Sequence, residues 1–230
     1  MKLAFMSVLG APALLVAAGA SAQWSDSFDT YADGSAVVGQ GGWEMWGGGA
    51  APHGIVTSAE ATHGPQSLEV INGDDIVHTY DEIAGAWQYR AMMLVPAEAA
   101  GAQTWFVMLN TYPATVNPDW SVAIVFDPNA GTVTSWDGAT LPLAAGAWTE
   151  IRVVINLDDD HQDIYYGGEL LTSKTWTGGV GEGGVARIHA VDLYAPQTEY
   201  STYWDDLSLV EVDPVGACCL ISGECIPDLG

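Results

Sequence analysis

The stretch Trp148-Thr-Glu-Ile-Arg-Val-Val-Ile-Asn-Leu-Asp158 indicates the fold most clearly. Ile151, Val153 and Ile155 recur at every second position, which is typical of a strand with one buried face. A second apolar run follows at residues 163–166, so we expect the aspartate-rich segment between the runs to be a hairpin turn. A weak calcium site is the alternative for this segment, although it lacks the glycine and terminal glutamate of an EF-hand.

Short β-type runs of the same kind recur along the chain and are separated by Gly, Pro, Asp and Asn. Together they cover residues 67–72, 76–80, 86–95, 104–112, 120–126, 132–136, 148–157, 163–166, 185–194 and 201–212. Turn signals such as Asn72-Gly73-Asp74 lie between them, and long helical patterns are absent outside the N-terminal segment. The sequence therefore predicts an all-β protein, a two-sheet antiparallel β-sandwich of the jelly-roll type.

Composition and charge exclude several classes of function. The chain has 230 residues, with 29 Asp or Glu against 5 Lys or Arg and a formal net charge of −24. Hydrophobic residues make up 49%, which fits one globular domain with a sizeable core and does not fit a disordered chain. We do not expect binding to nucleic acid or to anionic membranes, because both depend on basic side chains.

Residues 1–22 have the organisation of a secretory signal peptide. Lys2 precedes an apolar run, and Ala20-Ser21-Ala22 supplies a small-residue cleavage site. A membrane anchor is the alternative, but Gly10 and Pro12 interrupt the run, which is short for a membrane span. No later segment of the sequence is apolar over a membrane-spanning length, so we expect an exported protein that is secreted or held in the cell envelope.

Five segments of the chain, taken in order, form a pattern that is known from other proteins. They are Asp26-Ser-Phe-Asp29-Thr-Tyr, Gly39-Gln-Gly-Gly-Trp43, residues 148–158, Tyr165-Tyr-Gly-Gly168 and Tyr203-Trp-Asp-Asp-Leu-Ser-Leu209. The pattern resembles the concanavalin A-like lectin/glucanase superfamily, in the laminin-G-like jelly-roll form of secreted bacterial proteins. The resemblance implies that the first and last strands lie close together and that the ligand is a carbohydrate or a protein. We therefore expect a signal peptide at 1–22, a jelly-roll domain at 23–212, and a linker with a short cysteine-containing tail at 213–230.

Four aspartates are candidate metal ligands, namely Asp26, Asp29, Asp205 and Asp206. If the terminal strands pair, as the resemblance implies, these carboxylates can converge on one structural Ca²⁺, which takes about six to eight oxygen ligands. Asp205 and Asp206 are neighbours in a strand and point to opposite faces, so only one of them would be an inward ligand. The alternative is that the four are edge-strand charges that oppose aggregation.

Tryptophans in loops are the candidate ligand-binding residues. Trp43 and Trp46 lie in the glycine-rich segment 39–49, and Trp176 precedes two glycines. Sugar rings stack on tryptophan faces, and loops on a rigid sandwich often carry binding sites. The alternative for Trp43 is that it folds back onto the core. We expect the tryptophans within or at the start of strand runs to pack in the core; these are Trp87, Trp105, Trp120 and Trp148.

Catalytic motifs are absent from the sequence. Glucanases of the superfamily carry a Glu-x-Asp-x-Glu strand, which this chain lacks. Gly-x-Ser-x-Gly, His-Glu-x-x-His and P-loop motifs are also missing, and the five histidines are scattered. We therefore do not expect an enzyme.

All three cysteines, Cys218, Cys219 and Cys225, lie in the tail. Adjacent cysteines rarely bond to each other, so we expect Cys218 or Cys219 to pair with Cys225. The third thiol would then be available for a disulfide with another chain.

These features together predict a secreted, non-catalytic, lectin-like domain that binds a polysaccharide or glycan and contains a structural calcium. A structural or protein-interaction module of the cell envelope is the alternative, and the cysteine tail favours it. A polysaccharide-degrading enzyme is the third hypothesis, and the missing carboxylate strand argues against it.

Overall fold

The computed structural model describes residues 22–48, 53–113, 115, 117–181 and 183–213, together with two short strands of the tail, β16 (Cys218–Cys219) and β17 (Cys225–Ile226). The predicted signal peptide, apart from Ala22, and most of the predicted linker and tail lie outside these residues. In the part of the chain that is described, no helix is long and apolar enough to cross a membrane.

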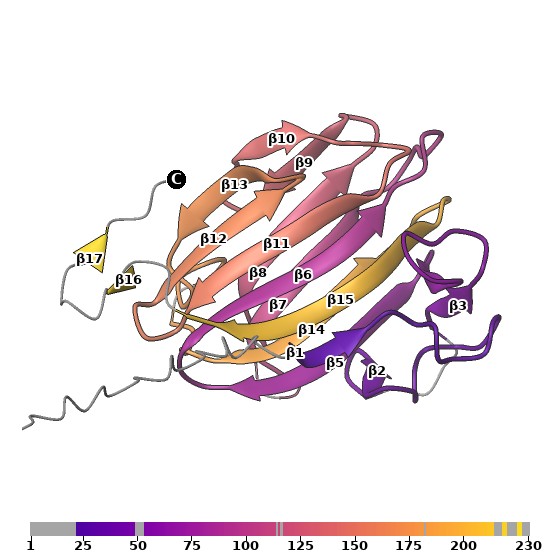
Figure 1. Ribbon diagram of the computed structural model, residues 1–230. Coiled ribbons are helices and arrows are strands. Elements are labelled where there is room, and N and C mark those ends of the chain that lie inside the picture. The colour runs from indigo at the N-terminus through magenta and orange to yellow at the C-terminus, as the bar shows by residue number, and fades with distance from the viewer. Residues whose placement is uncertain are drawn as a thin grey trace, which may run out of the picture.

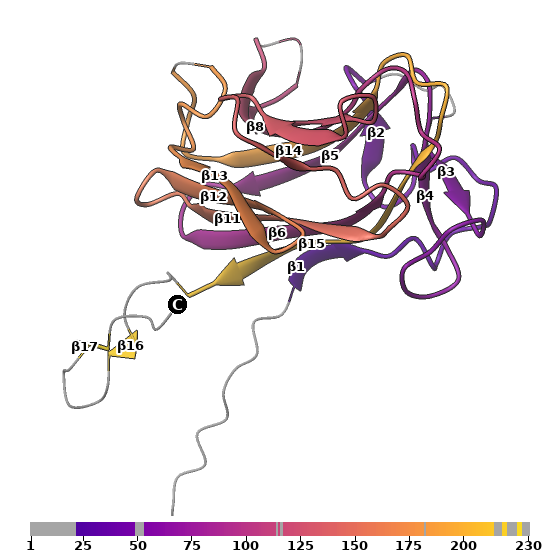
Figure 2. The same cartoon turned by 90° about the horizontal axis from the view of Figure 1, so that it is seen from above.

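Two antiparallel sheets lie face to face, as the two layers of Figure 2 show. The strands of the first, eight-stranded sheet are β1 (Ala22–Asp26), β3 (Ile55–Thr57), β4 (Ser67–Val70), β6 (Ala86–Leu94), β11 (Thr149–Asn156), β12 (His161–Tyr166), β13 (Glu169–Lys174) and β15 (Thr202–Val212). Their order is β13-β12-β11-β6-β15-β4-β3, and β1 also pairs with β15.

The second sheet has seven strands and forms the other layer (Figure 1). Its strands are β2 (Trp43–Met45), β5 (Asp74–Glu82), β7 (Thr104–Thr111), β8 (Asp119–Asp127), β9 (Thr132–Ser135), β10 (Thr140–Pro142) and β14 (Ile188–Ala195). Their order is β10-β9-β8-β7-β14-β5-β2. The predicted all-β, two-sheet antiparallel sandwich is confirmed.

The hairpin that indicated the fold is formed by β11 and β12. Ile151, Val153 and Ile155 are fully buried, and Val153 pairs with Ile164 across the hairpin. Asp160 has a φ of 50° in the turn, a conformation that Asp and Asn adopt more readily than most residues. Its carboxylate accepts hydrogen bonds from the backbone N–H and the hydroxyl of Thr177, both at 2.8 Å. The aspartate-rich segment is therefore the hairpin turn that was expected.

The first and last strands of the sandwich pair, as the resemblance implied. Asp26 of β1 lies opposite Leu207 of β15, and β15 in turn pairs with β6 in the middle of the sheet. Figure 1 shows β1 running beside β15 along one edge of the sandwich. This pairing brings the two ends of the domain together.

Large apolar side chains from both sheets fill the space between them. Phe106 and Phe126 of the seven-stranded sheet pack against Trp204 of β15, at ring-centroid distances of 6.0 and 6.3 Å. A second, separate cluster of buried apolar residues lies on the opposite face of the seven-stranded sheet, comprising Val77, Val107, Leu109, Tyr112 and Ala190. The outer face of a sandwich sheet usually carries polar side chains, so an apolar cluster there marks a candidate functional surface.

Candidate functional site

Asp26, the first predicted calcium ligand, is a buried hydrogen-bond acceptor. Its carboxylate accepts the backbone N–H of Phe28 at 2.9 Å, the hydroxyl of Tyr31 at 2.7 Å and the indole N–H of Trp43 at 2.9 Å. Burial and the hydrogen bond to Asp26 raise the pKa of the Tyr31 hydroxyl, which therefore keeps its proton. The Asp26 carboxylate therefore connects the first motif of the resemblance, which begins at Asp26, to the second, which ends at Trp43.

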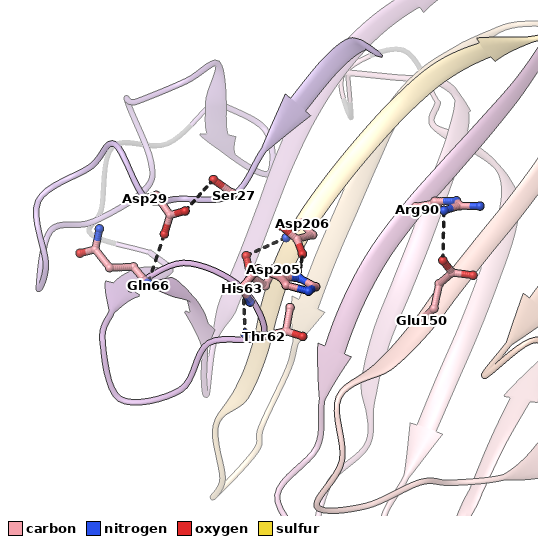
Figure 3. Close-up of polar contacts among 9 residues, drawn as sticks. All are labelled: Ser27, Asp29, Thr62, His63, Gln66, Arg90, Glu150, Asp205 and Asp206. Atoms are coloured by element: carbon pink, nitrogen blue, oxygen red, sulfur yellow. Dashed lines mark hydrogen bonds and ion pairs between the residues drawn. The ribbon is translucent and has the colours of Figure 1, made fainter. Parts of the chain in front are cut away.

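The other three predicted ligands are also engaged, as Figure 3 shows. Asp29 accepts the hydroxyl of Ser27 and the backbone N–H of Gln66, both at 3.2 Å. Asp205 is buried and accepts three backbone N–H groups, those of residues 62 and 63 at 2.9 and 3.3 Å and that of Asp206 at 2.8 Å. Asp206 contacts the ring of His63.

These four carboxylates do not fit a calcium ion as they are arranged. Both oxygens of Asp26 and of Asp205 already face N–H or O–H donors, whose partial positive charge would oppose a cation in the same place. Across the described ranges, no group of three or more His, Cys, Asp or Glu side chains is placed to hold a metal. The calcium site predicted from the sequence therefore has no support in this arrangement, and thermal unfolding with a chelator tests it.

Two of the three predicted ligand-binding tryptophans are core residues, which corrects the sequence interpretation. Trp43 is 2% exposed and Trp176 is fully buried. The indole of Trp43 is held by Asp26, and that of Trp176 donates to the carbonyl of Arg187 at 2.9 Å. Neither ring has a free face for a sugar, because both are buried. For Trp43, the core alternative applies.

The third tryptophan, Trp46, lines a hollow of about 310 Å³ on the outer face of the seven-stranded sheet. Two residues of β7, Trp105 and Val107, and Trp120 of β8 line the same hollow. Its remaining lining residues are Asp75 of β5 and Asp192 and Tyr194 of β14. We call this surface the aromatic groove.

Strand register explains why these side chains meet. Tyr194 lies opposite both Asp75 and Trp105, and Asp192 lies opposite Val107, so their side chains share one face of three adjacent strands. The intervening residue, Leu193, faces the core. The groove is therefore built on strands and is not built on loops alone.

Trp46 is placed over the groove by contacts at both sides. Its backbone N–H donates to the carbonyl of Asp75 at 2.9 Å, and its ring packs edge-on against Tyr112 at 5.3 Å. The hydroxyl of Tyr112 donates to Glu44 at 2.7 Å and accepts the backbone N–H of Gly47 at 3.2 Å. These bonds hold the turn that follows β2 against the end of β7.

Trp105 and Trp120 are only partly buried, which corrects the expectation that both pack in the core. Phe106, the neighbour of Trp105, takes the core-facing position, so the strand alternation places Trp105 outside. Trp136, at the end of β9, is 54% exposed and lies 6.4 Å from Trp105 between ring centroids. Aromatic surface therefore continues from the groove towards β9.

Asp75 and Asp192 form a carboxyl pair in the floor of the groove. The Oδ1 atoms of both are buried without a hydrogen-bond partner, and each carboxyl group shifts the pKa of the other. Burial raises the pKa of Asp192 well above its ordinary range, and the charge of Asp75 raises it further. Burial also raises the pKa of Asp75, against the opposing effect of His53. This favours a state in which the pair holds a proton.

The sequence contained a signal for this pair that the analysis of motifs missed. Asp192 stands between Val191 and Leu193 in an apolar strand, where an unpaired carboxylate would be costly. Its partner lies in β5, far away in the sequence, so only the strand order brings them together.

The cysteine tail is described only as the hairpin of β16 and β17. Its register places Cys219 opposite Cys225 and Cys218 opposite Ile226. The expected pairing of Cys218 or Cys219 with Cys225 stays a prediction.

Comparison with known proteins gives matches in structure alone. The sequence matches no protein-family model and no curated protein. An endo-β-1,4-glucuronan lyase from the fungus Trichoderma reesei has a TM-score of 0.55 at 13% identity, over 84% of this chain and 96% of that chain. The cellulose-induced protein Cip1 has a TM-score of 0.54 at 16% identity, over 84% of this chain and 99% of that chain.

A sialidase has a TM-score of 0.54 at 12% identity, over 84% of this chain. This chain spans only 19% of the sialidase, so it corresponds to one part of that longer protein. Together with the two sheets and the paired terminal strands, these likenesses show that the chain has the jelly-roll fold of the concanavalin A-like proteins.

Proposed function

We propose that this protein is a non-catalytic carbohydrate-binding domain whose glycan ligand lies in the aromatic groove. The observation that carries the proposal is the set of three partly buried tryptophans, Trp46, Trp105 and Trp120, around one hollow. Sugar rings present apolar C–H faces that pack on indole rings by dispersion and burial of apolar surface. Ligand sites commonly combine such an apolar lining with a few polar groups, which here are Asp75, Asp192 and Tyr194.

The sequence supports a binding role over a catalytic one, because it lacks the Glu-x-Asp-x-Glu strand of the superfamily's glucanases. Asp75 and Asp192 are the two carboxyl groups that line the groove. No further carboxylate is among the residues that line the groove. The pair is suited to bind sugar hydroxyl groups, because its two Oδ1 atoms have unused acceptor capacity.

Export belongs to the same proposal. The N-terminal segment with Lys2 and the Ala20-Ser21-Ala22 site supports a route out of the cell, where polysaccharides are available. The net charge of −24 supports solubility in salt-rich surroundings.

Retention on polysaccharides tests the proposal. The protein is passed over insoluble β-1,3-glucan, cellulose, xylan and mannan, and soluble oligosaccharides of the retained type are then titrated by calorimetry. Trp105→Ala and Trp120→Ala are each expected to weaken binding about 5- to 30-fold, because each removes roughly 1–2 kcal/mol of apolar contact. Tyr165→Ala is the matched control, since Tyr165 is an aromatic residue on the outer face of the other sheet, under Arg152.

Equal retention of the wild-type protein and both tryptophan variants would refute the groove as the binding site. Failure of every polysaccharide to retain the wild-type protein would refute carbohydrate binding itself. Release of reducing sugar from a retained polysaccharide, assayed in parallel, would refute the non-catalytic part of the proposal.

A further inference from the structure

We infer that the aromatic groove selects uncharged glycans and rejects chains of uronic acids. This inference rests on the proposed function and adds the chemical class of the ligand. Its basis is the distribution of charge around the groove, where carboxyl groups lie in the floor and the basic side chains of the described residues are engaged elsewhere.

The first observation is Asp192, a buried polar side chain that faces the groove with unused capacity. It is 4% exposed, lines the hollow, and its Oδ1 atom has no hydrogen-bond partner. Asp75 beside it also has an unpartnered Oδ1 atom. Two such acceptors next to each other suit the hydroxyl groups of a neutral sugar, which donate hydrogen bonds. An incoming carboxylate has no proton to donate.

The second observation is where the basic side chains lie. The sequence contains 5 Lys and Arg, and Lys2 is outside the described residues. Arg90 and Arg152 are on the outer face of the eight-stranded sheet, where both contact Glu150, and Figure 3 shows the pair of Arg90 with Glu150. None of the described Lys and Arg residues is among those that line the aromatic groove.

The other two described basic side chains are held by partners of their own. Lys174 donates to the carbonyl of Gly179 at 2.7 Å. Arg187 pairs with Asp81 at 2.9 Å; it directly precedes β14 and lies five residues before Asp192, roughly 16 Å along an extended chain. A uronic acid in the groove would therefore find no cation to neutralise it.

The charge of the groove therefore distinguishes a neutral sugar from a uronic acid of the same shape. A uronate placed beside Asp75 and Asp192 puts like charges together in a partly dehydrated site, and such juxtaposition weakens binding. A hexose with a hydroxymethyl group at the same position carries no charge and can donate a hydrogen bond. We therefore expect discrimination at the sixth carbon of the sugar, even though one structural neighbour is named as a glucuronan lyase.

Matched oligosaccharides test the inference, because they differ only at that carbon. Cellohexaose is compared with the hexasaccharide of β-1,4-linked glucuronic acid, and mannohexaose with that of β-1,4-linked mannuronic acid, by calorimetry at pH 7 and low salt. At least one neutral member is expected to bind at least tenfold more tightly than its uronate partner. In the double variant Asp75→Asn/Asp192→Asn, this ratio should fall at least about fivefold, because the carboxylates are replaced by neutral amides.

The matched control is Asp163→Asn on the outer face of the other sheet, which removes one negative charge, as the double variant does when the pair holds a proton. This control should keep the wild-type ratio of neutral to uronate affinity. It therefore separates repulsion of the uronate by the net charge of the protein from repulsion by Asp75 and Asp192. Uronates that bind as tightly as their neutral partners would overturn the inference and leave carbohydrate binding intact. If none of the four hexasaccharides binds although a polysaccharide retains the protein, the inference alone is overturned. If no polysaccharide retains it, the proposed function fails and the inference fails with it.

Discussion

Replacement of Asp26 by Asn tests whether this residue stabilises the fold as a hydrogen-bond acceptor. The carboxylate accepts three donors, and two of them, the Phe28 N–H and the Trp43 indole N–H, are buried. The third donor, the Tyr31 hydroxyl, is partly exposed and can be rehydrated in the variant. An Asn side chain has one acceptor oxygen in place of two, and its NH₂ group would face the remaining donors.

The expected loss follows from these contacts. Asn keeps one acceptor oxygen, so it loses at least one buried bond to a charged acceptor, which contributes about 1.5–3 kcal/mol. For a domain of this size each kcal/mol changes the Tm by roughly 2–4 °C. Asp26→Asn should therefore lower the Tm by at least about 3 °C.

Thermal unfolding followed by circular dichroism measures this loss, with Asp206→Asn as the matched control. That variant changes the net charge by the same amount at a half-exposed side chain whose partner, His63, is itself mostly exposed, so its Tm should change by less than about 2 °C. A Tm of Asp26→Asn equal to that of the control would refute the hydrogen-bond role of Asp26.

Three further predictions follow from other contacts. Gly179→Ala should destabilise the protein by about 1–3 kcal/mol or more in urea unfolding, because a Cβ at Gly179 would lie 1.9 Å from the carbonyl oxygen of Ser121; an unchanged midpoint would contradict this packing. Asp192→Asn should make the protein more stable relative to wild type at pH 8 than at pH 4. Burial and Asp75 raise the pKa of Asp192 in the folded state, so the native protein binds more protons than the unfolded chain above the ordinary Asp pKa, and wild-type stability falls as the pH rises through that window. Parallel stability–pH curves for the two proteins would argue against this. Removal of calcium with EDTA should leave the Tm unchanged, whereas an ion present at 100 times its Kd would add about 2.7 kcal/mol. A fall in Tm that Asp29→Ala abolishes would establish the predicted calcium site.

The strands were predictable because alternation is a local property. All ten runs expected from the sequence correspond to strands, and the run at 148–157 differs from β11 (Thr149–Asn156) by one residue at each end. The strands that the sequence did not predict are short, such as β2 and β10, or largely exposed, such as β13, and therefore lack a strong apolar pattern. The pairing of β1 with β15 came from the resemblance and not from periodicity.

The site was harder to predict because it depends on which face of a strand a residue occupies. Trp105 and Phe106 are neighbours and both aromatic, and only the register of β7 decides that Phe106 enters the core and Trp105 does not. Glycine-rich surroundings made Trp43 look exposed, yet Gly41 and Gly42 have positive φ angles that let the loop turn inward. The pairing of Asp75 with Asp192 depends on the order of strands in the sheet.

The central claim is that a glycan occupies the aromatic groove, and the indole N–H signals of the tryptophans test it most directly. Cellohexaose, laminarihexaose and mannohexaose are titrated into ¹⁵N-labelled protein, with each indole signal assigned by a Trp→Phe variant. The account predicts that the signals of Trp46, Trp105 and Trp120 shift together on titration. The signals of Trp43 and Trp176, which are bonded within the core, should stay in place. Shifts confined to tryptophans outside the groove, or no shift with any of the three sugars, would contradict the claim.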